Sequence, residues 1–321
     1  MKRKISYGGI AGAIGMLIIV LVRHTIDSNE KLSKDEPALI LKTHKDTVSY
    51  VLGGMYKNSV VGGQDPNIAK LDMQLVSKGF NENLDGAYPE DCQSTLKQLF
   101  GPNKQDFNEK YAKEGALCLG RITGYSFYQD MKRLNAMSEV DLKMVRIGFK
   151  HGILNIDTLL TEPQKQAIIG SFIAEVNEAN GKKMMEKARK IPGAKVFDNG
   201  VVIQVIKEGT GGYPSATDDV KVEYILTSAV GDTVQDSYKM KKERGTTDAV
   251  ALQLNGGVIP GWSFALPKMR KGGLYRLYLP WNLAYGEEAG RESLCFVIEL
   301  VDYAKQGTFV KPDPNTAIPG N

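Results

Sequence analysis

The period of the hydrophobic pattern changes near Ala194, and this change limits the possible folds more than any other feature. From about residue 46 to 190 the chain is rich in Lys, Glu, Leu, Met and Ala and shows no alternating segment, which indicates helices. Beyond Ala194, turn residues separate five alternating segments that we predict to be strands: Val201–Ile206, Val220–Leu226, Val250–Leu254, Leu274–Pro280 and Ser293–Tyr303. This order predicts an α+β protein in which an all-α region precedes an antiparallel sheet.

Local signals predict where some helices begin and end. Asp65-Pro66 combines an N-cap residue with proline at the first helical position, and Ser138 with Asp141 resembles a capping box. "TEPQ" (Thr161–Gln164) is a full capping box, and Pro192-Gly193 stops the helix that it opens. We therefore predict a long connecting helix from Thr161 to about residue 190.

Two stretches of the helical region resemble each other. "LDMQLVSKGF" (Leu71–Phe80) aligns without a gap with "VDLKMVRIGF" (Val140–Phe149). Upstream, "GGMYKN" (Gly53–Asn58) faces "YSFYQD" (Tyr125–Asp130), and the connection to the matched stretch is three residues shorter in the second copy. The match indicates a duplication, and its alternative is a chance likeness between amphipathic helices.

The duplication would place one copy at about 46–85 and the other at about 120–160, within a helical region of 46–190. A single copy would leave its apolar face open and would need a second chain to cover it. Two copies in one chain can cover each other, so we predict an intrachain pseudo-dimer, with a homodimer as the alternative. The segment 86–116 between the copies has the composition of an insertion.

The N-terminus carries a membrane signal. The basic residues Lys2–Lys4 precede 18 residues without a charge, Ile5–Val22. This run is longer than the apolar part of a cleaved signal peptide, and no small-residue cleavage site follows it. We predict that residues 1–26 form a single-pass membrane anchor, with a short cytoplasmic N-terminus and the body on the far side of the membrane. The alternative is a cleaved signal and a periplasmic or secreted protein.

The remaining segments and the composition add limits. Residues 27–45 read as a polar linker, and the Pro-rich tail 304–321 is predicted to be disordered. Hydrophobic residues make up 42% of the chain, charged residues 24%, and the net charge of +4 is spread out, which disfavours nucleic acid as a partner.

Few residues are candidates for metal or cofactor chemistry. Cys92 and Cys118 could pair in an oxidising compartment or remain free thiols, and Cys295 in an apolar run is predicted to be buried. The three histidines are isolated and are assigned to surface positions: His24, His44 and His151. The sequence shows no metal-ligand spacing and no nucleotide-binding loop, so we expect neither a metal nor a cofactor.

One group of motifs resembles the FKBP family of peptidyl-prolyl isomerases. "VIPGW" (Val258–Trp262) is followed by "ALPKMRKGGLYRLYLP" (Ala265–Pro280) and then by "NLAYG" (Asn282–Gly286). "DVKVEY" (Asp219–Tyr224) and "LCFVIELVDY" (Leu294–Tyr303) resemble the family's strands. The resemblance covers 195–303 and implies an antiparallel half-barrel wrapped on a short helix near 261–269.

The helical region, the long helix and "PGAKVFDNGVVIQVIKEGTG" (Pro192–Gly211) resemble the macrophage-infectivity-potentiator branch of that family. In that bacterial branch a helical domain dimerises, and a long helix joins it to the isomerase domain in the periplasm or on the cell surface. The resemblance thus implies a bacterial inner membrane for the anchor and the periplasm for the body. The duplicated helical region is a departure, because the branch carries one copy.

The resemblance implies isomerisation of X-Pro bonds, with proline-containing polypeptides of the cell envelope as clients. It places the pocket on six residues: Tyr224, Val258, Ile259, Trp262, Tyr285 and Phe296. Trp262 would form the floor for a proline ring, and the residue that matches Ile259 donates its backbone N–H to the ligand. The competing interpretation of each residue is ordinary core packing.

The sequence also departs from the family's pocket. Where the family has an aromatic residue followed by Asp, the ungapped match is Val234-Gln235, and a shift by one residue would recover Asp236. A further aromatic position falls near Val250, and the "EEAGRE" loop (Glu287–Glu292) is short and charged. These departures predict a shallow pocket with weak isomerase activity. The alternative is a degraded site in a holdase chaperone or protein-binding module.

Overall fold

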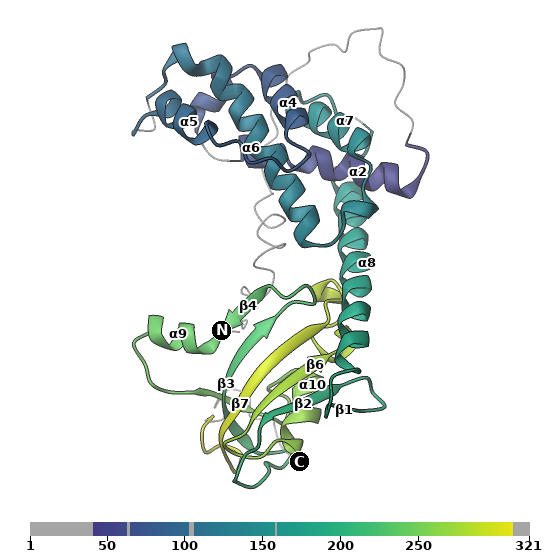
Figure 1. Cartoon of the computed structure of the whole chain (residues 1–321), viewed down its shortest axis with the longest axis vertical. Coiled ribbons are helices and arrows are strands. Elements are labelled where there is room, and N and C mark those ends of the chain that lie inside the picture. The colour runs from purple at the N-terminus through teal and green to yellow at the C-terminus, as the bar shows by residue number, and fades with distance from the viewer. Residues whose placement is uncertain (1–40, 63–64, 103–105, 158, 311–321) are drawn as a thin grey trace, which may run out of the picture. The chain divides into compact units, whose positions relative to one another are not determined.

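A computed structural model describes residues 41–62, 65–102, 106–157 and 159–310, shown in Figure 1. The described residues form two compact units, which we call the helical unit (41–173) and the sheet unit (174–310). Helix α8 (Glu162–Ala188) contributes its first part to the helical unit and its second part to the sheet unit. The predicted anchor at 1–26 and most of the predicted linker and tail lie outside the described residues.

The helical unit contains helices of very different length. They are α2 (His44–Met55), α3 (Asn58–Val61), α4 (Met73–Glu82), α5 (Cys92–Phe100), α6 (Ala112–Arg133), α7 (Leu142–Ile153) and the first part of α8. Short 3₁₀ turns lie between them: η1 (Pro66–Lys70), η2 (Glu109–Tyr111) and η3 (Met137–Glu139). Within the described ranges, no helix of either unit is long and apolar enough to cross a membrane.

Of the three predicted helix starts, one opens only a short 3₁₀ turn, one is wrong, and one is confirmed. Asp65 caps only the 3₁₀ turn η1, because Leu71 is extended, and α4 begins with a cap of its own at Asp72. Asp141 is itself the N-cap of α7, where its side chain accepts from the backbone N–H of Lys143. The long helix starts as expected: the Gln164 side chain accepts from the backbone N–H of Thr161 at 2.8 Å.

The helices of the helical unit cross in two closely matched pairs. Helix α2 packs on α7 and α4 packs on α6, while Phe80 of α4 stacks on Phe149 of α7 with ring centroids 3.8 Å apart. A Cβ on Gly53 would overlap the carbonyl oxygen of Val145, and a Cβ on Gly120 would overlap that of Val76. Glycine is therefore required at both crossings, because each brings a backbone onto a backbone.

The reciprocal contacts repeat this match. A Cβ on Gly148 would overlap the carbonyl oxygen of Tyr50, and a Cβ on Gly79 would overlap that of Leu117. Gly79 and Gly148 are aligned by the sequence match, and the structure places these two glycines in equivalent contacts. It also makes Gly53 equivalent to Gly120 and not to Tyr125, which corrects the upstream half of the sequence alignment.

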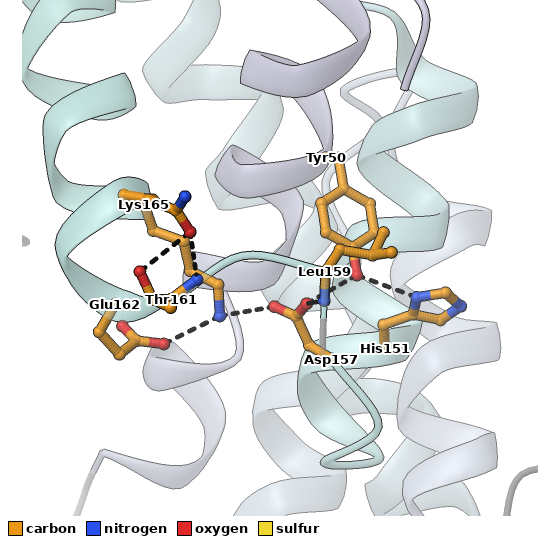
Figure 2. Close-up of polar contacts among 8 residues, drawn as sticks. Tyr50, His151, Asp157, Leu159, Thr161, Glu162 and Lys165 are labelled. Carbon is orange, nitrogen blue, oxygen red and sulfur yellow. Dashed lines mark hydrogen bonds and ion pairs between the residues drawn. The ribbon is translucent and has the colours of Figure 1, made fainter. Parts of the chain in front are cut away.

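A buried polar network ties α2, α7 and the start of α8 together, as Figure 2 shows. The fully buried Tyr50 donates its hydroxyl to Asp157 Oδ1 at 2.9 Å and lies 3.0 Å from His151 Nδ1. Asp157 Oδ2 pairs with Lys165 Nζ at 2.6 Å, and Lys165 also binds Glu162 at 2.8 Å. His151 is thus half-buried and hydrogen-bonded, and its assignment to a surface position is wrong; His44 is exposed as expected.

Burial and hydrogen bonding set the charge state of this network. Burial alone would raise the pKa of Asp157, but the hydrogen bonds from Lys165 and Tyr50 hold it below its usual value. Burial and the Asp157 carboxylate both raise the pKa of Tyr50, so its phenol keeps its proton. The network therefore holds a charged carboxylate against a charged lysine, with the tyrosine hydroxyl as a donor.

The insertion between the two predicted copies forms α5 and is covalently bound to α6. Cys92 at the start of α5 is bonded to Cys118 within α6, with Cα atoms 5.0 Å apart. Leu99 of α5 is fully buried and lies against Gly115 of α6. Of the two states left open by the sequence, the structure has the paired one, and Cys295 is a buried free thiol as predicted.

The sheet unit is an antiparallel sheet in the order β1-β2-β6-β7-β3-β4, with β5 also paired to β3. The strands are β1 (Lys195–Val196), β2 (Val202–Lys207), β3 (Asp219–Thr227), β4 (Thr233–Asp236), β5 (Val250–Gln253), β6 (Leu274–Leu279) and β7 (Leu294–Ala304). The five strands predicted from alternation are confirmed. The sequence analysis missed β1, which has only two residues, and β4, whose sequence "TVQD" has a single apolar residue and so no alternation.

Short helices complete the sheet unit. Helix α10 (Pro260–Ala265) and the 3₁₀ turn η4 (Leu266–Lys268) fill the predicted short helix, and their buried side chains join the core of the sheet. Helix α9 (Ser237–Glu243) was not predicted, because "SYKMKKE" has no apolar period. Two further turns, η5 (Trp281–Leu283) and η6 (Glu287–Ala289), lie between β6 and β7. The predicted fold class, helices followed by an antiparallel sheet, is confirmed.

Candidate active site

Trp262 is placed by the turn that opens α10. Ile259 is the extended N-cap residue, Pro260 occupies the first helical position, and the backbone N–H of Trp262 donates to Ile259 O at 2.9 Å. Gly261 lies against the side chain of Leu279, where a Cβ would be too close. Proline and glycine therefore fix the direction of the indole, which is only 5% exposed.

Two aromatic rings from neighbouring strands flank the indole. Tyr224 of β3 and Phe296 of β7 each have ring centroids 5.2 Å from that of Trp262, in edge-to-face arrangements. Phe296 is 1% exposed, whereas Tyr224 is half-buried. This geometry is the favourable one for aromatic pairs, and it builds a rigid apolar surface around one indole face.

Val258, Ile259 and Tyr285 complete the predicted set. All three are partly buried and pack against the same core cluster that contains Trp262 and Phe296. The structure thus brings all six predicted residues together in one cluster of the sheet unit. Their roles in catalysis stay predictions.

Gln235 lies where the ungapped match to the family pattern has an acidic residue. The hydroxyl of Tyr224 donates to Gln235 Oε1 at 2.7 Å, and Gln235 pairs with Leu226 across β3 and β4. Asp236 instead accepts from the backbone N–H of Lys239 as the N-cap of α9. The alternative in which Asp236 is shifted into the pocket is therefore wrong. An amide oxygen can accept this hydrogen bond as a carboxylate does.

The backbone of Tyr224 is held by residues that the sequence analysis missed. Its N–H donates to Ser237 Oγ at 2.8 Å, and Ser237 in turn donates to the carboxylate of Glu223, which is 3% exposed. Lys241 of α9 pairs with Glu223 and neutralises its buried charge. Burial raises the pKa of Tyr224, with a smaller opposing effect of Arg244, so the hydroxyl remains a donor. The sequence signal was the Asp-Ser pair that opens α9.

The walls of the site are less aromatic than the family pattern. Val234 and Val250, at positions where the family has aromatic residues, pack against the core cluster as partly buried aliphatic side chains. Each offers less apolar area than a ring. Within the described residues no group of acidic, histidine or cysteine side chains could hold a metal ion, and the six clustered side chains carry no charge.

The short loop after Tyr285 is tightly folded. Gly286, Gly290 and Arg291 all have positive φ, and the Arg291 N–H donates to Gly286 O at 3.3 Å. The Arg291 guanidinium pairs with Glu287 at 2.9 Å and lies 5.6 Å from the Trp281 ring centroid. Burial, with a smaller effect of Asp232, raises the pKa of Glu292 to about 7.

Known proteins resemble the chain over this site and beyond it. A profile of the family described as FKBP-type peptidyl-prolyl cis-trans isomerase matches residues 211–301, which include all six clustered residues. The outer membrane protein MIP of Legionella longbeachae is 30% identical over 178 residues, which cover 49% of this chain and 73% of that protein. The chain belongs to the FKBP-type peptidyl-prolyl cis-trans isomerase family.

Other family members match in the same way. FkpA of Escherichia coli K12 is 38% identical over 144 residues, 43% of this chain and 48% of that protein, so the chain spans about half the length of this relative. The isomerase Mip of Coxiella burnetii is 26% identical over 59% of this chain and 85% of its own length. The crystal structure of FkpA from Escherichia coli matches 64% of this chain with 28% identity and a TM-score of 0.37.

Proposed function

We propose that the sheet unit isomerises X-Pro peptide bonds of other polypeptides and so assists their folding. Rotation about a peptide bond costs ~18–20 kcal/mol because resonance is lost. The unaided reaction at X-Pro takes tens of seconds or more, which is slow enough to limit folding. Catalysis needs no acid, base or metal, because an apolar surface that fits the twisted amide better than the planar one lowers the barrier.

The observation that carries this proposal is the placement of Trp262 between Tyr224 and Phe296. A proline ring can lie on the flat indole, with Val258, Ile259 and Tyr285 packed in the same cluster. The Nε1–H of Trp262 is buried and has no acceptor among the described residues. The hydrogen bond from Tyr224 to Gln235 fixes the orientation of the tyrosine ring.

The activity should be weak. Val234 and Val250 stand where the family has aromatic rings, and the loop of residues 287–292 is charged. Both changes remove apolar area that would exclude water from the twisted amide. Replacing Val234→Phe together with Gln235→Asp restores the family's pair and should raise the rate.

A protease-free assay with a prolyl tetrapeptide tests the proposal. The wild-type chain should accelerate cis-to-trans conversion, and Trp262→Leu, which keeps apolar volume but loses the flat floor, should abolish the acceleration. Circular dichroism should show that the variant remains folded. A wild-type rate equal to the uncatalysed rate would contradict the enzyme and favour the binding module.

The second candidate is a holdase or protein-binding module with a degraded site, and the charged short loop favours it. It predicts that the chain suppresses aggregation of an unfolded client and that Trp262→Leu leaves this suppression unchanged. If the variant with Val234→Phe and Gln235→Asp isomerises peptides while the wild type does not, the site has lost its activity. If neither the wild type nor this variant isomerises peptides, the short charged loop of residues 287–292 is the cause of the lost activity.

We also propose that the helical unit is an intrachain pseudo-dimer built from two copies of one helical motif. The reciprocal glycine contacts support it, because Gly53 meets Val145 as Gly120 meets Val76. Phe80 stacks on Phe149, and these two phenylalanines are aligned by the repeat. Each copy thus covers the other, so the fragment 23–321 should be monomeric in light scattering at micromolar concentration. A stable dimer would favour the homodimer.

We place this chain in a bacterial envelope, held by residues 1–26 in the inner membrane with its body in the periplasm and with envelope proteins as clients. A relative is named as an outer membrane protein, and the Cys92–Cys118 bond suits an oxidising compartment. Membranes washed with carbonate should retain the chain. A soluble chain that lacks the first ~25 residues would show a cleaved signal instead.

A further inference from the structure

The second part of α8 docks on the loop that follows Tyr285. The side chain of Asn177, only 7% exposed, donates to Gly290 O at 2.9 Å. One turn further along the helix, Gly181 lies against Ser293, where a Cβ would overlap the hydroxyl oxygen. Arg291 adds an ion pair to Glu178 at 3.3 Å. The helix therefore contacts residues 290 and 291 of the loop and residue 293 just after it.

The loop in turn is bonded to the segment that carries Tyr285. Ser293 Oγ accepts from the backbone N–H of Trp281 at 3.2 Å. Trp281 O accepts from the N–H of Gly286 at 3.1 Å, and Gly286 O accepts from that of Arg291 at 3.3 Å. These hydrogen bonds connect Trp281, Gly286, Arg291 and Ser293 on both sides of Tyr285. Helix α8 contacts two of these residues, Arg291 and Ser293.

The docking is fixed by packing as well as by polar contacts. Met185 and Ala188 of α8 form a buried cluster with Val202 of β2, and Tyr278 of β6 packs against it. Gly181 is buried, whereas Gly170 on the same helix is exposed, and a Cβ added to Gly170 would have no atom from outside its own helix within 4 Å. The glycine at 181 is thus a close-approach position, and the glycine at 170 is not.

We propose that Asn177 and Gly181 of α8 are positioning residues for the isomerase site, which hold Tyr285 in place through residues 290–293. The inference deepens the proposed function and rests on it. The short loop lacks the apolar residues that the family pattern places there. Contacts from α8 to residues 290–293 hold the loop in their place. Residues 174–188 are then part of the catalytic unit as well as part of the connecting helix.

A double-mutant cycle in the full chain tests this proposal. Gly181→Leu should push the helix from Ser293 and lower kcat/KM about tenfold through kcat, because a small misplacement of a pocket residue is costly. Tyr285→Ala should lose a similar factor. The double variant should lose no more than either single one, because both remove the same contribution. Gly170→Leu is the matched control and should keep wild-type activity.

A second readout guards against a variant that merely unfolds. The chain has two tryptophans, so 5-fluorotryptophan gives two ¹⁹F resonances, of Trp262 and Trp281. Gly181→Leu and the milder Asn177→Ala should shift the Trp281 resonance and leave the spectrum folded, and Asn177→Ala should lower kcat by a smaller factor. Gly170→Leu should shift neither.

The outcomes separate the two proposals. Additive losses in the cycle, or an unchanged kcat when the Trp281 resonance has moved, would overturn the positioning role alone. A wild-type chain that neither isomerises nor binds the prolyl peptide would overturn the proposed function, and the positioning role with it.

Discussion

The helical unit and the candidate pocket of the sheet unit are each stabilised internally, but by different kinds of contact. In the helical unit, backbone lies on backbone at several glycines of the helix crossings, so no side chain can be added there. In the candidate pocket, side chains pack on Trp262, and a Gln at the family's acidic position keeps the bond to Tyr224. A backbone contact tolerates no substitution, whereas a hydrogen bond tolerates any side chain that supplies the same acceptor. Changes in the helical unit should therefore affect stability, and changes in the pocket should affect rate.

The largest expected effect is on the helical unit. Gly148→Ala places a methyl group on the carbonyl oxygen of Tyr50, and relief requires the two helices to separate. We expect a loss of about 3 kcal/mol in the free energy of unfolding, measured by urea denaturation. The kcat/KM of the folded chain should be unchanged. Gly170→Ala is the control and should be slightly more stable than wild type; equal losses at both positions would contradict the crossing.

The disulfide should contribute to the stability of the helical unit. Cys92 and Cys118 are separated by 26 positions, and a loop of that size corresponds to about 3 kcal/mol in the chain-entropy account. Replacing both with serine should lower the melting temperature of the helical unit and remove its sensitivity to reductant. If reductant has no effect on the wild type, the two cysteines are not paired in the protein.

In the sheet unit, a stability effect should depend on pH. Burial raises the pKa of Glu292 to about 7 from 4.5, so the unfolded state releases its proton first as the pH rises. The free energy of unfolding should then fall as the pH rises from 4.5 to about 7. Above pH 7 the full cost of burying the charged Glu292 carboxylate is present. Glu292→Gln should therefore stabilise the chain by about 3 kcal/mol near pH 8 and by almost nothing near pH 4.

The exposed Glu288 provides the comparison for this change. Glu288→Gln should leave the pH profile of unfolding as in the wild type. A pH-independent effect of Glu292→Gln would show that the carboxyl is not desolvated.

The smallest expected effect is in the pocket. Gln235→Ala removes the acceptor of the Tyr224 hydroxyl, which should cost about 1 kcal/mol, or roughly fivefold in kcat/KM. Gln235→Glu keeps an oxygen at the same place and should retain activity. The unfolding midpoint should hardly change in either variant. Equal rates for Gln235→Ala and wild type would show that the bond does not hold the pocket.

The sequence grouped the predicted site residues better than it predicted the packing of the helices. Pro260-Gly261-Trp262 and the strand motifs carry local signals, so six candidate residues could be named, and they are found in one cluster. Their role as a pocket stays a prediction. The equivalence of Gly53 with Gly120 is set by which backbone each meets across a crossing, and no local pattern records it. Sequence alignment therefore matched Gly53 with the wrong residue.

Other features depend on contacts between distant residues. The hydrogen bond from Tyr224 to Gln235 rests on the register of β3 with β4, which decides against Asp236. The docking of Gly181 on Ser293 joins residues 112 positions apart, and a helix pattern alone gives no sign of it. Helix α9 was not predicted because its polar sequence has no helical period of apolar residues.

Isomerisation at the Trp262 site is the central claim, and exchange NMR on a prolyl peptide tests it most directly. With a catalytic amount of the wild-type chain, exchange cross-peaks should connect the cis and trans resonances of the X-Pro bond. With Trp262→Leu at the same concentration they should disappear, while the spectrum of the variant shows a folded protein. Cross-peaks of equal strength with the variant, or none with the wild type, would contradict the account.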